Sequence, residues 1–194
     1  MAVAGRPVVV TAPAEAVRAE IGLSLLPEDR KTEALFLGLS GLHNASLPVI
    51  GRFARRGIID TGAEARAVAA AFDRVEVDRR ALWTRAGAFS GGNQQKIAIA
   101  KWLLAGSRVL LLYDPTRGID VGTKHELYRL MRDYAAAGGS ILFYSTEIPE
   151  LVHLADRVMV FYHGRVAETV EEDRISEEAI LTAALGGEPE ALRA

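Results

Sequence analysis

The chain contains no cysteine, and this absence excludes disulfide frameworks and thiolate metal sites and fits a reducing cytoplasm. Charge of one sign is not in excess either, because 23 Lys and Arg oppose 25 Asp and Glu. A nucleic-acid binder carries surplus basic residues that neutralise phosphates, so we expect no nucleic-acid partner. No apolar run approaches the roughly 18 residues that a membrane span needs. Any membrane contact is therefore expected to come through a partner.

What is present predicts an α/β fold. The 194 residues are 49% hydrophobic, enough for one compact domain with a core. Short apolar runs alternate with helical patterns, which predicts a mainly parallel sheet with helices on its faces. The apolar runs cover residues 8–10, 21–26, 109–112, 141–144 and 158–161, and an early helical pattern covers 14–20. Residues 116–148 read most clearly as a βαβ unit.

Other stretches break this alternation. Residues 38–88 are punctuated by Gly and Pro and rich in Arg and Ala, with a helical pattern at 63–72, so we predict a helical subdomain beside the sheet. The chain becomes acidic after Arg165, and one further helix is expected around 177–185, followed by a frayed tail. The four His residues are scattered without ligand spacing, so no metal site is predicted from them.

The segment 89–96 carries the strongest chemical pattern. Ser90 is a suitable N-cap for the helical pattern at 97–104, and two glycines expose backbone N–H groups at a helix N-terminus, where phosphate is favoured. Ser-Gly-Gly alone also fits a glycine turn before a capped helix. The full segment is more specific; it reads Phe89-Ser90-Gly91-Gly92-Asn93-Gln94-Gln95-Lys96.

This octet resembles the signature motif of ATP-binding cassettes (the ABC family), in the form typical of bacterial sugar importers. The resemblance implies that the Ser and the glycines touch the γ-phosphate of an ATP held by an opposite cassette. It predicts ATP-binding roles for Ser90, Gly91, Gly92 and Asn93, and implies the P-loop NTPase fold of an ABC ATPase for residues 1–194, with the signature and C-terminal sheet part at 89–194.

A second motif follows at 110–120, where an apolar strand ends in Tyr113 and Asp114. A carboxylate at the C-terminal edge of a parallel sheet is placed for metal or phosphate chemistry, although a buried strand before a solvated turn gives the same pattern. It resembles the Walker B strand and D-loop of the same family, whose pattern is Leu-Leu-Leu-Asp-Glu-Pro-Thr. Tyr113 then stands at the Mg²⁺-associated Asp and Asp114 at the catalytic Glu, and the D-loop adds Asp120 to the ATP-binding residues. A Tyr offers no carboxylate to a hard cation. The Asp side chain is one methylene shorter than that of Glu, which is short for polarising the attacking water.

Two more segments resemble the second cassettes of sugar-importer ATPases. Thr146 occupies the place of the switch His that contacts the γ-phosphate in many cassettes. By chemistry alone, the residues around Thr146 read as a polar helix cap with Glu150 in the first turn of the helix. Residues 27–31 resemble the segment that replaces the Q-loop. By chemistry alone they form a solvated charged turn. In the family, this region and the helical subdomain face the membrane permease, so 38–88 is the expected coupling surface.

One family element does not occur in the sequence. No Gly-x-x-x-x-Gly-Lys-[Ser/Thr] string is found, the P-loop that cradles the β- and γ-phosphates. Residues 5–13 resemble the part of a cassette that follows the P-loop helix, so the resemblance begins inside the domain. We expect a sheet edge left exposed, with either a longer reading frame or another polypeptide supplying the remainder.

The resemblance implies the ATP-binding subunit of a carbohydrate importer, peripheral at the inner face of the cell membrane. ATP and Mg²⁺ would be bound at a composite site, with permease subunits, another cassette and indirectly a sugar-binding protein as partners. The alternative is a degenerate, non-hydrolysing module with an interaction or regulatory role, favoured by Tyr113, Thr146 and the absent P-loop. A third possibility, a cassette protein acting on ribosomes or DNA, is disfavoured by the charge balance.

Overall fold

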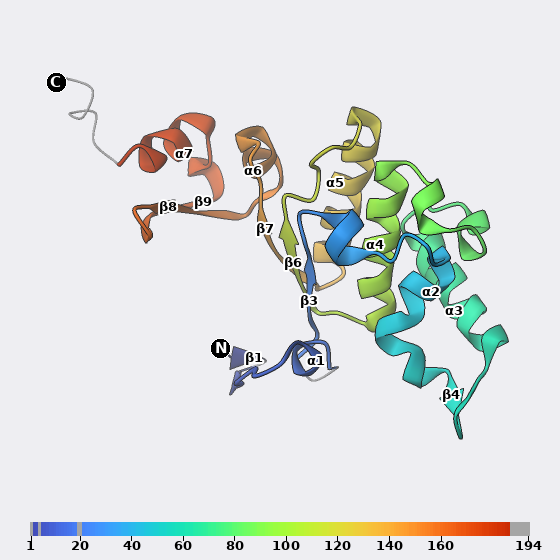
Figure 1. Cartoon of the computed structure of the whole chain (residues 1–194). Coiled ribbons are helices and arrows are strands. Elements are labelled where there is room, and N and C mark those ends of the chain that lie inside the picture. Colours follow the sequence, from blue (N-terminus) through green and yellow to red (C-terminus); the bar gives the residue numbers. More distant parts are fainter. Residues whose placement is uncertain (1, 4, 19–20, 187–194) are drawn as a thin grey trace. The chain divides into compact units, whose positions relative to one another are not determined.

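The computed structural model describes residues 2–3, 5–18 and 21–186 (Figure 1). The chain packs as two units, Met1–Tyr144 and Ser145–Ala194, and each is described by itself. Among the described residues, no helix has both the length and the apolar character needed to cross a membrane.

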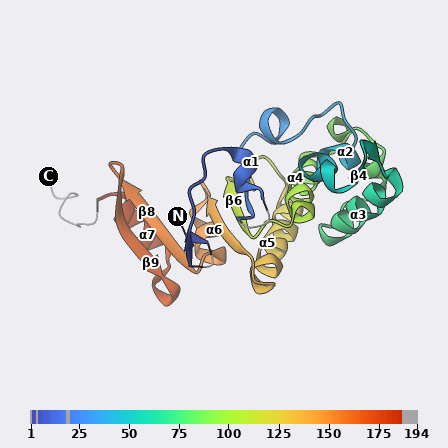
Figure 2. The same ribbon diagram turned by 90° about the horizontal axis from the view of Figure 1, so that it is seen from below.

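The first unit is built on a three-stranded parallel sheet. Its strands are β3 (Leu23–Leu26), β6 (Val109–Tyr113) and β7 (Ser140–Tyr144), in the order β3-β6-β7. The long helices α4 (Gly91–Ala105) and α5 (Val121–Ala136) lie on the same side of the strands (Figures 1 and 2). The predicted α/β class, the parallel pairing and the β6-α5-β7 unit are confirmed.

The two faces of this sheet differ in burial. Strand residues alternate in direction, and Leu26, Leu110 and Leu112 are buried on one face. Leu25 and Leu142 alternate to the other face and remain 52% and 54% exposed. Parallel strands normally have both faces covered, so the exposure of Leu25 and Leu142 gives this sheet a partly exposed apolar face.

Residues 38–88 form the helical segment. It contains α2 (Gly41–Ser46), η2 (Leu47–Arg52), the hairpin strands β4 (Ala54–Arg55) and β5 (Ile58–Ile59), α3 (Thr61–Arg74), η3 (Arg79–Leu82) and η4 (Ala86–Ala88). The predicted helix at 63–72 lies inside α3. Val68 and Phe72 have no exposed surface, and α3 packs against α2 and α4. Burial of this apolar face holds the segment onto α4.

The N-terminal part departs from the sequence prediction. It contains β1 (Ala2–Val3), β2 (Arg6–Pro7), α1 (Pro13–Ala16) and the π-helix η1 (Arg30–Ala34). The predicted strand at 8–10 is wrong, because Pro7 and Pro13 bracket that run and have no N–H to extend a ladder. The helix predicted from 14 to 20 is shorter, since Ala12 provides no side-chain cap, and residues 19–20 lie outside the described residues.

The second unit contains α6 (Ile148–Leu154), β8 (Arg157–Tyr162), β9 (Arg165–Glu171), η5 (Glu172–Arg174) and α7 (Glu177–Ala184). The predicted strand at 158–161 and the C-terminal helix are confirmed. The strand does not join the parallel sheet, because it pairs antiparallel with β9. His163 and Gly164 between them have φ of 46° and 75°, and two successive positive φ values favour such a hairpin. The predicted tail after 186 lies outside the described residues.

Candidate functional site

Ser90 caps the N-terminus of α4, as the sequence predicts. Its exposed Oγ accepts hydrogen bonds from the Asn93 backbone N–H at 3.5 Å and from Asn93 Nδ2 at 3.2 Å. Gly91 and Gly92 occupy the first helical turn, where N–H groups have no intrahelical acceptor. The helix dipole concentrates positive potential there, so an anion is favoured beside Ser90.

The two glycines are needed for packing within the chain as well. A Cβ on Gly92 would lie 2.5 Å from Thr123 Cγ2 and 2.7 Å from Thr123 Oγ1. A Cβ on Gly91 would collide with the Arg30 guanidinium and lie 3.3 Å from the Gly118 carbonyl oxygen. The Gly-Gly pair therefore lets the start of α4 approach both η1 and the loop before α5.

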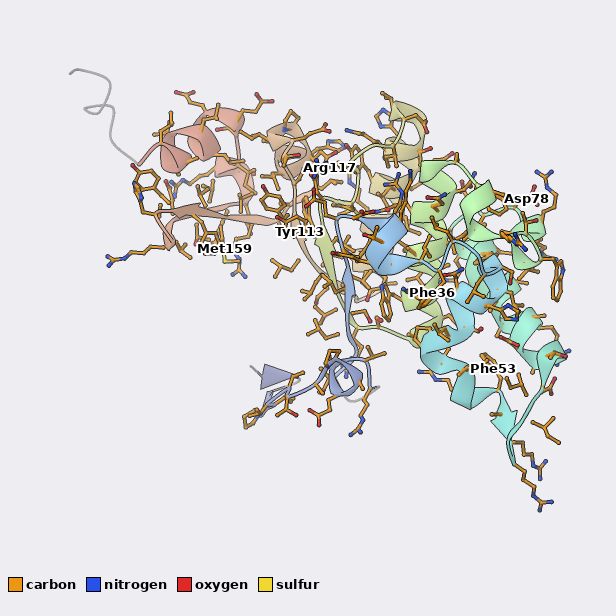
Figure 3. The ribbon with its side chains drawn as sticks, in the orientation of Figure 1. Phe36, Phe53, Asp78, Tyr113, Arg117 and Met159 are labelled. Atoms are coloured by element: carbon orange, nitrogen blue, oxygen red, sulfur yellow. The ribbon has the colours of Figure 1, made fainter. Side chains whose placement is uncertain are left out.

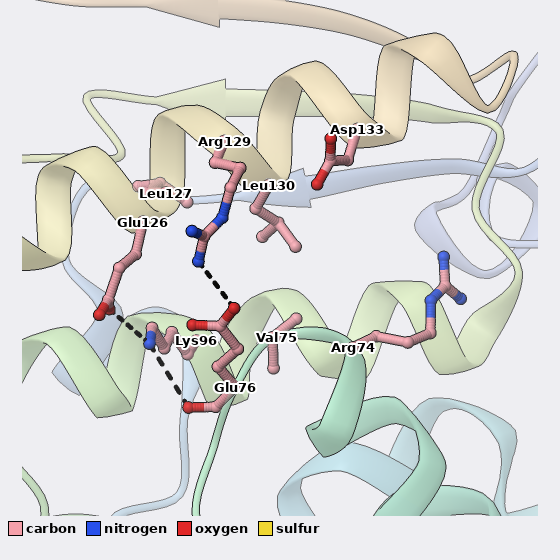
Figure 4. Close-up of a pocket in the computed structure, with 9 residues that line it drawn as sticks. All are labelled: Arg74, Val75, Glu76, Lys96, Glu126, Leu127, Arg129, Leu130 and Asp133. Carbon is pink, nitrogen blue, oxygen red and sulfur yellow. Dashed lines mark hydrogen bonds and ion pairs between the residues drawn. The ribbon is translucent and has the colours of Figure 1, made fainter.

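The last three residues of the octet are buried and anchor α4 to its neighbours. Gln95 Nε2 donates to the Pro115 carbonyl at 2.7 Å. Lys96, 8% exposed, pairs with Glu126 of α5 at 2.6 Å and donates to the Glu76 carbonyl at 3.4 Å. Lys96, Glu126 and Glu76 line a pocket shown in Figure 4, where Arg129 also pairs with the Glu76 carboxylate at 2.7 Å. Lys96 thus links the helical segment to α5.

The end of β6 carries an aromatic pair. Tyr113 (Figure 3) is 46% exposed. Its ring stacks on Tyr144 with centroids 4.8 Å apart. Asp114 is buried, has a φ of 46° and donates its N–H to the Tyr144 carbonyl at 2.8 Å. Within the described ranges, no group of three or more His, Cys, Asp or Glu side chains is arranged to hold a metal ion. With a stacked phenol at the strand end, these residues do not fit a Mg²⁺ site of their own.

The loop from Arg117 to Asp120 leads from β6 to α5. Asp120 caps α5, accepting from the Thr123 N–H at 3.0 Å and from Thr123 Oγ1 at 2.7 Å. The hydrogen bonds from the Thr123 N–H and hydroxyl lower the pKa of the Asp120 carboxyl, so it is ionised at neutral pH. Thr123 also packs on Gly92, so Asp120 and the start of α4 share one neighbour.

The turn at 27–31 makes contacts with the loop before α5 that the sequence did not predict. Arg30 donates from Nη1 to the Arg117 carbonyl at 3.1 Å and from Nη2 to the Gly118 carbonyl at 3.5 Å. Glu28 forms an ion pair with the Arg117 side chain. By its charges alone this turn was expected to be solvated; Glu28 and Arg30 are partly exposed and also bind the loop before α5. The available signal was the family match of the segment.

Thr146 belongs to the second unit and is exposed. It does not cap α6, because the N-cap is Glu147. Ser145 provides the local anchor instead. Its Oγ accepts from the Glu147 N–H at 3.0 Å and donates to the buried Glu150 carboxylate at 2.7 Å. Glu150 lies in the first turn of α6, as predicted.

Comparison with protein families gives a match over residues 10–117 to the family described as ABC transporter. The chain belongs to the ABC transporter family. The match takes in the first-unit sheet strands β3 and β6, the helical segment and helix α4.

Curated relatives of this ABC chain are ribose import proteins. The ribose import ATP-binding protein RbsA 1 of Mesorhizobium japonicum is 47% identical over 181 residues, covering 93% of this chain and 35% of the relative. RbsA 2 of Burkholderia ambifaria is 45% identical over 186 residues, covering 95% of this chain and 36% of the relative. The chain spans about a third of the length of these relatives.

Solved ABC cassettes share the fold. The dimeric cassette MJ0796 in a post-hydrolysis state, bound to ADP and Pi, has a TM-score of 0.65 at 21% identity, covering 77% of this chain and 62% of that one. cbiO1 of Clostridium perfringens, part of the ABC transporter complex cbiONQ, has a TM-score of 0.70 at 17% identity. The match covers 94% of this chain and 68% of that one. The fold is therefore that of the ABC ATPase cassette, a P-loop NTPase.

The residues that the sequence predicts to form the signature lie together in the first unit. Ser90, Gly91, Gly92 and Asn93 form the start of α4, and Asp120 is connected to them through Thr123. Asp114 lies at the end of β6 in the same unit. Thr146 lies in the second unit.

Proposed function

We propose that this chain is an ATP-binding part of an ABC importer for a carbohydrate, and that it supplies the signature half-site of a composite ATP site. The main support is the start of α4, where the exposed Ser90 hydroxyl and the amides of Gly91 and Gly92 lie beside each other. The P-loop of such a site would belong to another cassette. The names of the relatives make ribose the first sugar to test.

The half-site acts by electrostatics and orientation. ATP, when bound, supplies a γ-phosphate whose negative charge matches the N-terminal end of the α4 dipole. Ser90 Oγ has a hydroxyl proton to donate outward, because both of its described bonds accept from Asn93. The side chain of Asn93 holds the Ser90 rotamer. Closure of two cassettes over the nucleotide would then drive the permease.

Mg²⁺ in this proposal is held by the partner cassette. Tyr113 gives no carboxylate and Asp114 is buried, so this chain contributes no binding step for the ion. Asp114 takes the catalytic Glu position, with a shorter reach toward an attacking water. Removal of one charge-stabilising group costs about 100- to 1000-fold in rate. We therefore expect slow turnover at any site that relies on Asp114.

The partners follow from the same assignment. A second cassette faces the start of α4, and permease subunits face the helical segment at 38–88. Large apolar side chains are exposed there, namely Leu39, Leu47, Ile58, Ile59 and Trp83. Such exposed apolar groups are common where proteins bind one another. The chain would then work peripherally at the inner face of the cell membrane, and a sugar-binding protein would act through the permease.

The alternative function is a non-hydrolysing ABC module that binds partners. The Tyr113–Tyr144 stack favours it, because an aromatic pair fills the strand end where the family carries a carboxylate. This alternative predicts partner binding that is independent of ATP.

The test is nucleotide-dependent pairing. The purified 194-residue chain is mixed with an ABC cassette that carries an intact P-loop, with Mg²⁺ and a non-hydrolysable ATP analogue, and association is followed by sedimentation. We expect pairing that requires the nucleotide and is abolished by Ser90→Arg, which places a cation and bulk at the phosphate position.

The matched control is Ser176→Arg, since Ser176 is also an exposed serine that caps a helix, α7, and accepts from the Ala179 N–H at 3.1 Å. It should pair as the wild type does. Pairing that persists in Ser90→Arg contradicts the half-site proposal. Pairing of equal strength without nucleotide supports the non-hydrolysing module instead.

A further inference from the structure

Arg30 lies between two parts of the proposed half-site, the start of α4 and the loop 117–120. Its guanidinium donates to the Arg117 and Gly118 carbonyls of the loop before α5, at 3.1 and 3.5 Å. The same guanidinium fills the space beside Gly91, where a Cβ would collide with Nη2. One side chain therefore contacts the loop that leads to Asp120 and also the first residue of α4.

The backbone around Arg30 is itself held in place. Asp29 caps η1 by accepting from the Lys31 N–H at 2.9 Å. At the other end of η1, the Ala34 carbonyl accepts from Lys101 Nζ at 2.7 Å. Since both ends of this short helix are fixed, Arg30 reaches the loop from a defined starting point.

The polar atoms of Arg30 point to a specific role. Its Nε is buried and has no hydrogen-bond partner among the described residues. A buried donor without an acceptor is a cost that a surface arginine would avoid by turning into solvent. The orientation of Arg30 is thus set by the Nη bonds to the loop, and Glu28 adds a second link through its ion pair with Arg117.

We propose that Arg30 is a positioning residue that joins the loop 117–120 to the start of α4, so that Ser90 and Asp120 meet a partner cassette as one rigid surface. This inference rests on the proposed half-site. Arginine suits the task because its planar fork reaches two carbonyls at once, whereas lysine is a single point donor. Gly91 completes the arrangement by leaving room for the fork.

Hydrogen exchange of the 194-residue chain tests the link directly. Arg30→Met removes two charge-assisted bonds, so we expect amide exchange in residues 115–121 to accelerate by about tenfold. Arg30→Lys should retain only part of the protection, and Glu28→Gln should give a smaller acceleration in the same loop. Arg165→Met, a change at an exposed arginine of β9, is the matched control and should leave the loop unchanged.

The pairing assay supplies a second readout. Arg30→Met should raise the concentration of ATP analogue needed for half-maximal pairing by about tenfold, with Arg30→Lys in between. Unchanged exchange in both Arg30→Met and Glu28→Gln overturns the inference. A wild-type chain that never pairs refutes the proposed function, while the exchange data still decide whether Arg30 holds the loop. Faster exchange with unaltered pairing overturns the positioning role.

Discussion

Replacing Gly92 with alanine should destabilise the first unit, although alanine is the better helix former. The new Cβ would lie 2.5 Å from Thr123 Cγ2 and 3.1 Å from Thr123 Cβ. Thr123 is short and β-branched, and its hydroxyl is bonded to Asp120, so a rotation away from the new Cβ would break that hydrogen bond. Overpacking of this kind costs about 1 to 3 kcal/mol, and alanine returns up to about 1 kcal/mol of helix propensity. We expect a net loss of about 1 to 2 kcal/mol.

Gly62→Ala is the matched control for this prediction. Gly62 holds the same second helical position in α3 that Gly92 holds in α4. Its Cβ would meet nothing nearer than 3.3 Å, from the flexible end of Arg66. The same substitution should therefore stabilise the chain by about 0.5 to 1 kcal/mol.

Urea unfolding followed by tryptophan fluorescence measures both changes. The two tryptophans, Trp83 and Trp102, lie in the first unit, so the signal reports its unfolding. Thr123→Ala should relieve the clash and couple to Gly92→Ala by about 1 kcal/mol in a double-mutant cycle. If Gly92→Ala is as stabilising as Gly62→Ala, or the coupling is absent, the packing argument is wrong.

Two further predictions concern buried polar groups. Burial lowers the pKa of Lys101 to about 8. In the unfolded chain the Lys101 amine keeps its proton to higher pH, so the free energy of unfolding should rise by about 2 to 3 kcal/mol from pH 8 to 10.5. Lys101→Met should remove that rise in urea unfolding series at several pH values, and parallel curves for the two proteins would contradict it. Asn44→Asp should lower the free energy of unfolding by about 3 kcal/mol. Asn44 Nδ2 donates to three carbonyls, including those of Phe36 and Leu39, and a carboxylate oxygen has no hydrogen to donate to them. A midpoint in urea close to that of the wild type would refute it.

The sequence predicted the regular elements of the sheet and the start of α4 because their signals are local. Apolar runs bounded by turn residues gave β3, β6 and β7, and Ser90 before two glycines gave the cap. The run at 158–161 was recognised as a strand, but its partner was not, because the pattern of one strand does not reveal whether its neighbour runs parallel or antiparallel. Pairing with β9 depends on the turn at His163 and Gly164.

The contacts between distant segments were not predictable in the same way. Arg30 and Gly118 are far apart in the chain, and a charged turn looks solvated until the fold brings a carbonyl to it. The reason for Gly92 was also hidden, because its partner Thr123 lies on another helix. Sequence reasoning found the glycines through phosphate chemistry, and the structure adds steric fit as a second requirement.

The order of strands in the first sheet has a consequence for folding. Leu23 pairs with Val109, so forming β3-β6 closes a loop that contains the whole helical segment. The helices at 41–74 pack on one another and on α4, contacts that span shorter stretches of chain than the β3-β6 pairing, so this pairing needs the larger loss of chain entropy. Until then, the Leu-rich run of β6 is unpaired and able to associate with other chains. Slow refolding with concentration-dependent losses is therefore expected, and changes that strengthen α2 and α3 should do little to accelerate the slow step.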